Sequence, residues 1–179
     1  MISLMSAEKV TEDLMAWADA FDPDFASCLH ADPEMTKAIL SIGRGGKKPR
    51  KDFANWKDAK YFIQFFFDPY FAIEEPITEF SAEDIKKVLD EYLACYDPAD
   101  DANAWFDKVK KIAEQNGYCT NMKEYKLDPT GWKGSIGDVS TFLRVALTGR
   151  KNSPDLYTVI SILGAERASA RIRAYENNL

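Results

Sequence analysis

Side chains that could bind an anion or a nucleic acid gather in one short block of the chain, residues 141–157. They are Arg144, Arg150, Lys151 and Tyr157. Arg150 and Lys151 fall in a short connection that leads into a predicted helix, and a helix start presents N–H groups that have no partner inside the helix. The block therefore offers a place where an anion or an RNA loop could bind.

Two predicted helix ends meet in this block. Apolar residues recur at helical spacing through Leu147, and Gly149 supplies the left-handed residue that commonly ends a helix. Ser153 is predicted to cap the next helix, with Pro154 at its first position and Asp155 in its first turn. Many tight turns between helices carry such caps and bind nothing, so a purely structural turn remains an alternative.

A second group of cations lies far from the first, in a loop broken by glycine and proline at residues 44–51. Its members are Arg44, Lys47, Lys48, Arg50 and Lys51. The net charge is −6, whereas a general nucleic-acid binder is basic. Two basic patches on an acidic chain instead suit a protein that holds a nucleic acid at chosen points.

Three further arginines occur near the end of the chain, Arg167, Arg171 and Arg173. For these we favour the simpler interpretation that they solvate the outer face of the last helix, because charged outer faces are the rule for surface helices.

Catalytic and metal-binding patterns are missing from the sequence. The one histidine, His30, has no partner motif, and the three cysteines are far apart and form no Cys-x-x-Cys pair. No Walker loop, Gly-x-Gly-x-x-Gly turn or nucleophile elbow is present. We therefore expect a binding module with neither a catalytic site nor a metal site.

The elements that position these groups are predicted to be helices throughout, with no alternating strand pattern. Residues 97–102 are acidic and contain a proline, which indicates a boundary between domains at 1–97 and 98–179. Residues 118–137 are predicted to form an irregular connection. No apolar run is long enough to span a membrane and no signal peptide is evident, so we expect a soluble, cytoplasmic protein.

Several motifs closely resemble the C-terminal, anticodon-binding region of bacterial glutamyl-tRNA synthetase (glutamate–tRNA ligase, a class I aminoacyl-tRNA synthetase). Three lie near the end of the chain: Leu143-Arg-Val-Ala-Leu-Thr-Gly149, Ser153-Pro-Asp-Leu-Tyr157 and Ile162-Leu-Gly-Ala-Glu-Arg167. A fourth, Gly45-Gly-Lys-Lys-Pro-Arg-Lys-Asp52 followed by Trp56, is similar to the first anticodon-binding subdomain of the family. The motifs occur in the expected order over most of the chain.

The resemblance implies an all-α fold of two small helical subdomains that form a cage around the anticodon loop. It implies that the partner is the anticodon stem-loop of tRNA(Glu), with no DNA and no membrane, and that the chain is a monomer. ATP and magnesium are expected only in a catalytic domain of the parent ligase, because the two-histidine signature of that domain cannot occur in a chain whose one histidine is His30. We expect the chain to be a piece of that longer enzyme.

The resemblance also assigns roles to residues of the block. Arg144 matches an arginine that contacts an anticodon base, Ser153 and Pro154 match a Ser/Thr-Pro pair, and Leu156 and Tyr157 match residues that pack on or beside the bases. A guanidinium can donate two parallel hydrogen bonds to a base, and an unpaired base stacks on an aromatic ring. Asp155 departs from the small residue of some relatives, so its carboxylate is expected to serve the helix cap.

In the first basic loop, Arg50 matches an arginine that reads the last anticodon base and helps to exclude tRNA for glutamine. Arg44 or Lys48 could take that place instead, because loop length varies among relatives. Possible phosphate contacts are Arg44, Lys47, Lys48, Lys51, Arg150 and Lys151.

Two other classes of function remain open from the sequence. One is a helical protein-interaction module that has lost RNA binding. The other, a small autonomous enzyme, has little support because no nucleophile–base or metal constellation can be named.

Overall fold

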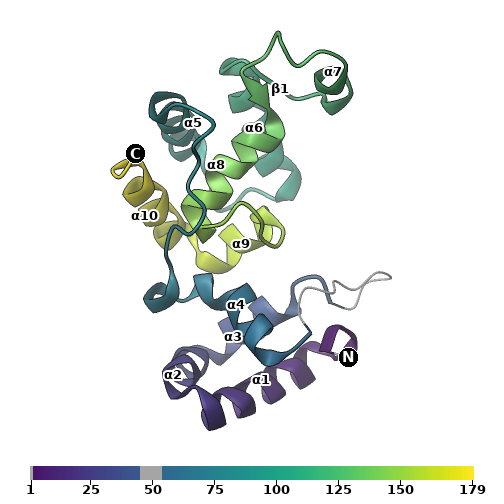
Figure 1. The fold of residues 1–179 in the computed structure, drawn as a ribbon, viewed down its shortest axis with the longest axis vertical. Coiled ribbons are helices and arrows are strands. Elements are labelled where there is room, and N and C mark those ends of the chain that lie inside the picture. Colours follow the sequence, from purple (N-terminus) through teal and green to yellow (C-terminus); the bar gives the residue numbers. More distant parts are fainter. Residues whose placement is uncertain (1, 45–53) are drawn as a thin grey trace. The chain divides into compact units, whose positions relative to one another are not determined.

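A computed structural model describes residues 2–44 and 54–179 of the chain. The described residues form two compact units, Met1–Ala72 and Ile73–Leu179, and both are built almost entirely of helices (Figure 1). The predicted all-α fold class is confirmed for the described part of the chain. None of its helices is both long and apolar enough to cross a membrane.

The first unit is a small group of helices. Its elements are the 3-10 helix η1 (Ile2–Leu4), α1 (Ala7–Phe21), α2 (Pro23–Ala31), α3 (Pro33–Ser41), α4 (Trp56–Ile63), and the 3-10 helices η2 (Gln64–Phe66) and η3 (Asp68–Tyr70). Contacts of α1 with α2, α3 and α4 hold the unit together. Apolar side chains at helical spacing, among them Leu14, Leu29 and Ile39, are buried between these helices.

Local capping explains where the helices of the first unit begin. The side chain of Ser6 accepts a hydrogen bond from the N–H of the third helical residue of α1. Asp22 and Asp32 do the same for α2 and α3, and each is followed by a proline at a position where a missing N–H costs nothing. Each of these three helix starts therefore follows from a short local pattern.

The second unit contains a longer set of elements. They are α5 (Ala82–Cys95), α6 (Ala102–Gln115), β1 (Tyr118–Cys119), α7 (Met122–Leu127), β2 (Gly134–Ser135), α8 (Ile136–Thr148), α9 (Leu156–Leu163) and α10 (Ala165–Glu176). Helix α8 contacts α5, α6, α9 and α10, and Figure 1 shows it passing through the middle of this unit. Its residues Val139, Phe142 and Leu143 are accordingly buried.

The boundary between the compact units lies at residues 72/73 rather than at the predicted 97/98. Helix α5 packs against α6, α8 and α10, and therefore lies in the second unit. The stretch after α5 is a turn within that unit, where Tyr92 of α5 accepts a hydrogen bond from the Trp105 indole of α6 at 2.9 Å. A polar segment that contains proline ends a helix whether or not a domain ends there.

The expectation of an irregular connection without strands at residues 118–137 was wrong in part. The connection includes helix α7 and a short parallel pairing of β1 with β2. The pair lies against the core, since the Tyr118 and Cys119 side chains are buried. Two residues per strand are too few for an alternating pattern to be visible in the sequence.

Candidate functional site

The block at residues 141–157 forms the end of α8, a turn and the start of α9. Gly149 has a left-handed backbone (φ 77°) and ends α8 as predicted. The predicted cap of α9 was wrong. Helix α9 begins at Leu156 and is capped by Asp155, whose carboxylate accepts hydrogen bonds from the N–H and hydroxyl of Thr158 at 2.9 and 2.7 Å. An aspartate competes well with a serine two positions earlier for this role.

Ser153 instead orients Arg144. The Arg144 Nε donates a hydrogen bond to the Ser153 hydroxyl oxygen at 3.0 Å, and that hydroxyl donates to the carbonyl of Pro154 at 2.8 Å. Burial lowers the pKa of the Arg144 guanidinium, while the charge of Asp155 opposes this shift. The side chain is half-buried, and its two terminal nitrogens have no hydrogen-bond partner among the described residues. The two terminal nitrogens of this half-buried side chain could therefore donate hydrogen bonds to a ligand.

The other three predicted site residues, Pro154, Leu156 and Tyr157, differ in solvent accessibility. Pro154 and Leu156 are buried and pack into the core. Tyr157 is half-exposed, and its hydroxyl donates to the carbonyl of Asp100 at 2.9 Å. Its ring lies 6.0 Å from that of Trp105. Of Leu156 and Tyr157, only Tyr157 therefore presents part of its side chain to solvent.

The turn after Gly149 is held by the segment Ile73–Phe80, which we call the acidic strap. Both Arg150 Nε and Nη2 donate to the carboxylate of Glu74, at 3.1 and 2.9 Å. The Arg150 side chain is only 8% exposed. The backbone N–H groups of Glu74 and Glu75 both donate to the carbonyl of Gly149 at 2.9 Å. The strap thereby satisfies groups that the end of a helix leaves without partners.

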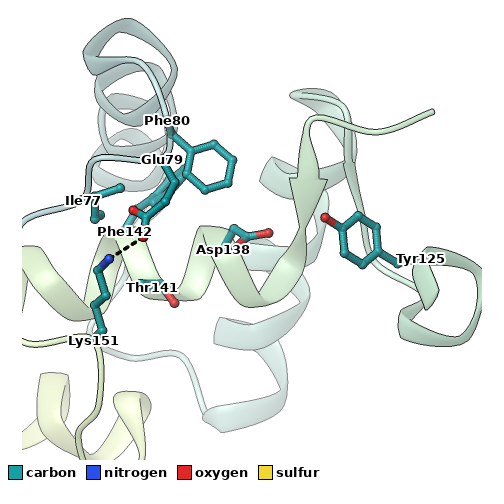
Figure 2. A pocket seen from close by; sticks show the side chains of 8 residues that line it. All are labelled: Ile77, Glu79, Phe80, Tyr125, Asp138, Thr141, Phe142 and Lys151. Carbon is teal, nitrogen blue, oxygen red and sulfur yellow. Dashed lines mark hydrogen bonds and ion pairs between the residues drawn. The ribbon is translucent and has the colours of Figure 1, made fainter. Parts of the chain in front are cut away.

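Lys151 is held by the same strap. Its N–H donates to the Glu75 carboxylate at 2.7 Å, and its ammonium donates to the Glu79 carboxylate at 2.6 Å. Figure 2 shows this second pair at one side of a cavity of about 370 Å³, with Thr141 and Phe142 of α8 beside it. The Lys151 hydrogen bond and two backbone N–H groups hold the pKa of Glu79 at about 2.

These contacts correct the prediction for Arg150. Its guanidinium is buried against Glu74 and does not present itself to a phosphate. The interpretation of the last three arginines needs a similar correction. Arg171 is buried and donates to the carbonyl of Leu147 at 2.8 Å, whereas Arg173 is exposed as predicted. A buried arginine is stable here because it bonds to the carbonyl groups near the end of α8.

The first basic loop is described only at its start. Arg44 Nε donates to the carbonyl of Leu40 at 2.6 Å, and Nη1 donates to the carbonyls of Ile2 and Met5 at 2.8 and 3.3 Å. Arg44 therefore holds the end of α3 against the start of the chain. The other four predicted residues of this loop lie outside the described residues: Lys47, Lys48, Arg50 and Lys51.

Sequence reasoning missed the strap glutamates and Trp105 as parts of this site. A cluster of carboxylates at 74, 75 and 79 was visible, but nothing local indicated that it would pair with cations more than 70 positions later. Residues 2–44 and 54–179 include no group of three or more histidine, cysteine, aspartate or glutamate side chains that could hold a metal ion. His30 lies in the first unit, 2.9 Å from the carboxylate of Asp19.

Comparison with known proteins gives an independent view of this region. Residues 131–175, which include α8, the turn and α9, match the family described as anticodon binding domain. Glutamate–tRNA ligases match nearly the whole chain. That of Acetivibrio thermocellus is 39% identical over 174 residues, 97% of this chain and 32% of the relative. That of Sorangium cellulosum is 41% identical over 179 residues, 98% and 31% respectively.

A third relative, the glutamate–tRNA ligase of Clostridium beijerinckii, is 38% identical over 183 residues. The chain spans about a third of the length of these curated relatives. No solved structure gives a significant match. The matches do not favour the alternative of a helical protein-interaction module that has lost RNA binding. They confirm that this chain resembles the C-terminal, anticodon-binding region of glutamate–tRNA ligases.

Proposed function

We propose that the chain recognises the anticodon loop of tRNA(Glu), as part of a glutamate–tRNA ligase. The observation that carries this proposal is the Arg144 guanidinium, half-buried at the end of α8, with Nε held by Ser153. It lies within the segment that matches the anticodon binding domain.

Arg144 is suited to reading a base rather than to holding a phosphate at a distance. The Ser153 hydroxyl restrains the plane of the guanidinium, so the two terminal nitrogens can donate in parallel to a base edge with little loss of rotamer freedom. Partial burial strengthens these hydrogen bonds relative to those in water. A wrong base would leave desolvated donors without acceptors, and this is the source of discrimination.

Tyr157 is proposed to stack against an unpaired base. Its hydroxyl is tied to the Asp100 carbonyl and its ring is close to Trp105, so the ring orientation is set before RNA arrives. A preorganised aromatic face contributes about 1–3 kcal/mol per stacked base. Leu156 and Pro154, which are buried, are proposed to contribute by packing rather than by direct contact with a base.

The remaining parts of the proposal follow the family. Arg50 is proposed to read the last anticodon base, with Lys47, Lys48 and Lys51 near phosphates. We propose a cytoplasmic protein that acts as a monomer on the anticodon stem-loop and not on DNA. ATP and magnesium would serve glutamylation in a catalytic domain of the longer enzyme, and the residues of this chain would position the tRNA.

The substitution Arg144→Ala tests the base-reading role. It should weaken binding of the tRNA(Glu) anticodon stem-loop by about 1–3 kcal/mol, the range for a bidentate base contact, and should weaken binding of unrelated loops much less. Gel shift with stem-loops of different anticodon sequence measures this. The control is Arg173→Ala, which removes an exposed arginine from α10. Equal affinity of the unchanged chain for every loop would refute the proposal.

A further inference from the structure

The acidic strap forms hydrogen bonds with three consecutive residues at the start of the turn, Gly149, Arg150 and Lys151. The carboxylate of Glu74 accepts from the Arg150 guanidinium. The carboxylates of Glu75 and Glu79 accept from the Lys151 N–H and the Lys151 ammonium, respectively. The Gly149 carbonyl is taken by two strap N–H groups. The strap therefore does more than cap α8, because a cap requires only the backbone contacts.

The charges of the strap exceed those of the turn. Three carboxylates face two cations, and both cations are bonded to carboxylates. Arg144, less than two helical turns earlier, has a neutral hydroxyl as its partner instead. Arg150 and Lys151 are thus paired with carboxylates, whereas Arg144 in the same block is bonded to a neutral hydroxyl.

We propose that the acidic strap withholds Arg150 and Lys151 from RNA phosphates, so that the block at residues 141–157 discriminates between loops through Arg144 of α8. This inference rests on the proposed anticodon recognition and specifies how that site limits contacts that carry no sequence information. Phosphate contacts strengthen binding to every RNA equally, and so they dilute a preference that comes from base contacts.

Of Arg150 and Lys151, Lys151 is the better test of this proposal because its side chain is accessible to solvent. Its side chain is 36% exposed and that of Glu79 is 58% exposed, so a phosphate could reach the ammonium. A phosphate in that place would lie beside the carboxylates of Glu79 and Glu75, and like charges so close repel one another. Glu79, whose pKa is about 2, keeps its charge at any physiological pH.

The substitution Glu79→Gln tests this inference in the full chain. It keeps an acceptor for the Thr78 N–H and removes the charge opposite Lys151. We expect binding to single-stranded poly(U) RNA to become about threefold tighter at 50 mM salt, with the slope of log affinity against log salt steeper by about 0.7, as for one added phosphate contact. The ratio of affinities for the tRNA(Glu) loop and an unrelated loop should fall.

Two controls separate release of Lys151 from a general change of charge. Glu83→Gln removes one negative charge from the start of α5, where the carboxylate has no partner among the described residues, and should leave the salt slope unchanged. Adding Lys151→Gln to Glu79→Gln should cancel the steeper slope. A mainly structural role for Glu79 would change the unfolding midpoint but not the slope.

An unchanged poly(U) affinity and salt slope in Glu79→Gln would overturn the inference, as would an equal change in Glu83→Gln. Failure of the proposed function looks different. In that case the unchanged chain would bind all anticodon loops alike, while the poly(U) measurement would still decide whether the strap withholds Lys151.

Discussion

The arginines that were candidates for RNA contact have different partners in the two compact units. In the first unit, Arg44 donates to three backbone carbonyls at the ends of η1 and α3. In the second, Arg150 is locked by the carboxylate of Glu74, and Arg144 is only steered by a hydroxyl. Each arginine lies at or near the end of a helix and was a candidate for RNA contact.

This difference shows that the position of a cation within a basic stretch of sequence does not determine whether it can bind RNA. A carbonyl or a carboxylate that lies within reach uses up the donors of a guanidinium, and what remains is available to a ligand. By this measure Arg144 of α8 is better placed to bind RNA than Arg150 of the turn that follows.

The largest expected effect comes from breaking the buried pair of the second unit. Glu74→Ala removes the carboxylate that pairs with the buried Arg150 guanidinium and should lower the free energy of unfolding by about 3 kcal/mol. Urea unfolding followed by circular dichroism measures the loss, and hydrogen exchange should rise in α8 and α9.

Its matched control is an exposed pair of the first unit. Glu8→Ala removes the partner of Lys37, where the side chains are 63% and 46% exposed, and should cost less than about 1 kcal/mol. If both substitutions lowered the free energy of unfolding by similar amounts, burial would not explain a difference in strength between the two ion pairs.

The next effect concerns Arg44. Arg44→Ala removes the donors for the carbonyls of Leu40, Ile2 and Met5, and should cost about 2 kcal/mol of unfolding free energy, because hydrogen bonds from a charged donor are stronger than average. Urea unfolding checks this value. Unchanged stability together with weaker tRNA binding would instead identify Arg44 as a phosphate contact.

The smallest expected effect is the dependence of stability on pH, which can be compared between the two units. Both units contain a carboxylate whose pKa is lowered mainly by a lysine, Asp22 by Lys60 in the first and Glu79 by Lys151 in the second. A lowered folded-state pKa gives stability that is present above the ordinary carboxyl range and is lost as pH falls through the folded value. Since Glu79 is exposed, we expect its pairing to matter more for the turn than for global stability.

An NMR titration of the side-chain carboxyl group should place the pKa of Glu79 at about 2. In Lys151→Gln the pKa should move up toward its usual value, because the largest cause of the shift is the Lys151 hydrogen bond. A normal pKa in the unchanged chain would mean that the pair does not persist in solution.

Features that depend on neighbours within a few residues can be predicted from the amino-acid sequence. The starts of α1, α2 and α3 at Ser6, Asp22 and Asp32 and the end of α8 at Gly149 were all predictable. A cap needs one side chain and an N–H three positions away, so the pattern carries the full information. The ordered motifs of the last helices were enough to indicate the family resemblance.

Which charged side chains remain available to a ligand depends instead on contacts between segments that are far apart in the sequence. The tertiary structure paired Glu74 with Arg150 across 76 positions, buried Arg171 against α8, and assigned the cap of α9 to Asp155 so that Ser153 could orient Arg144. It also placed α5 in the second unit. Such pairings arise only when packing of the apolar faces brings distant segments together and removes water from their charges, and no local pattern records which segments will meet.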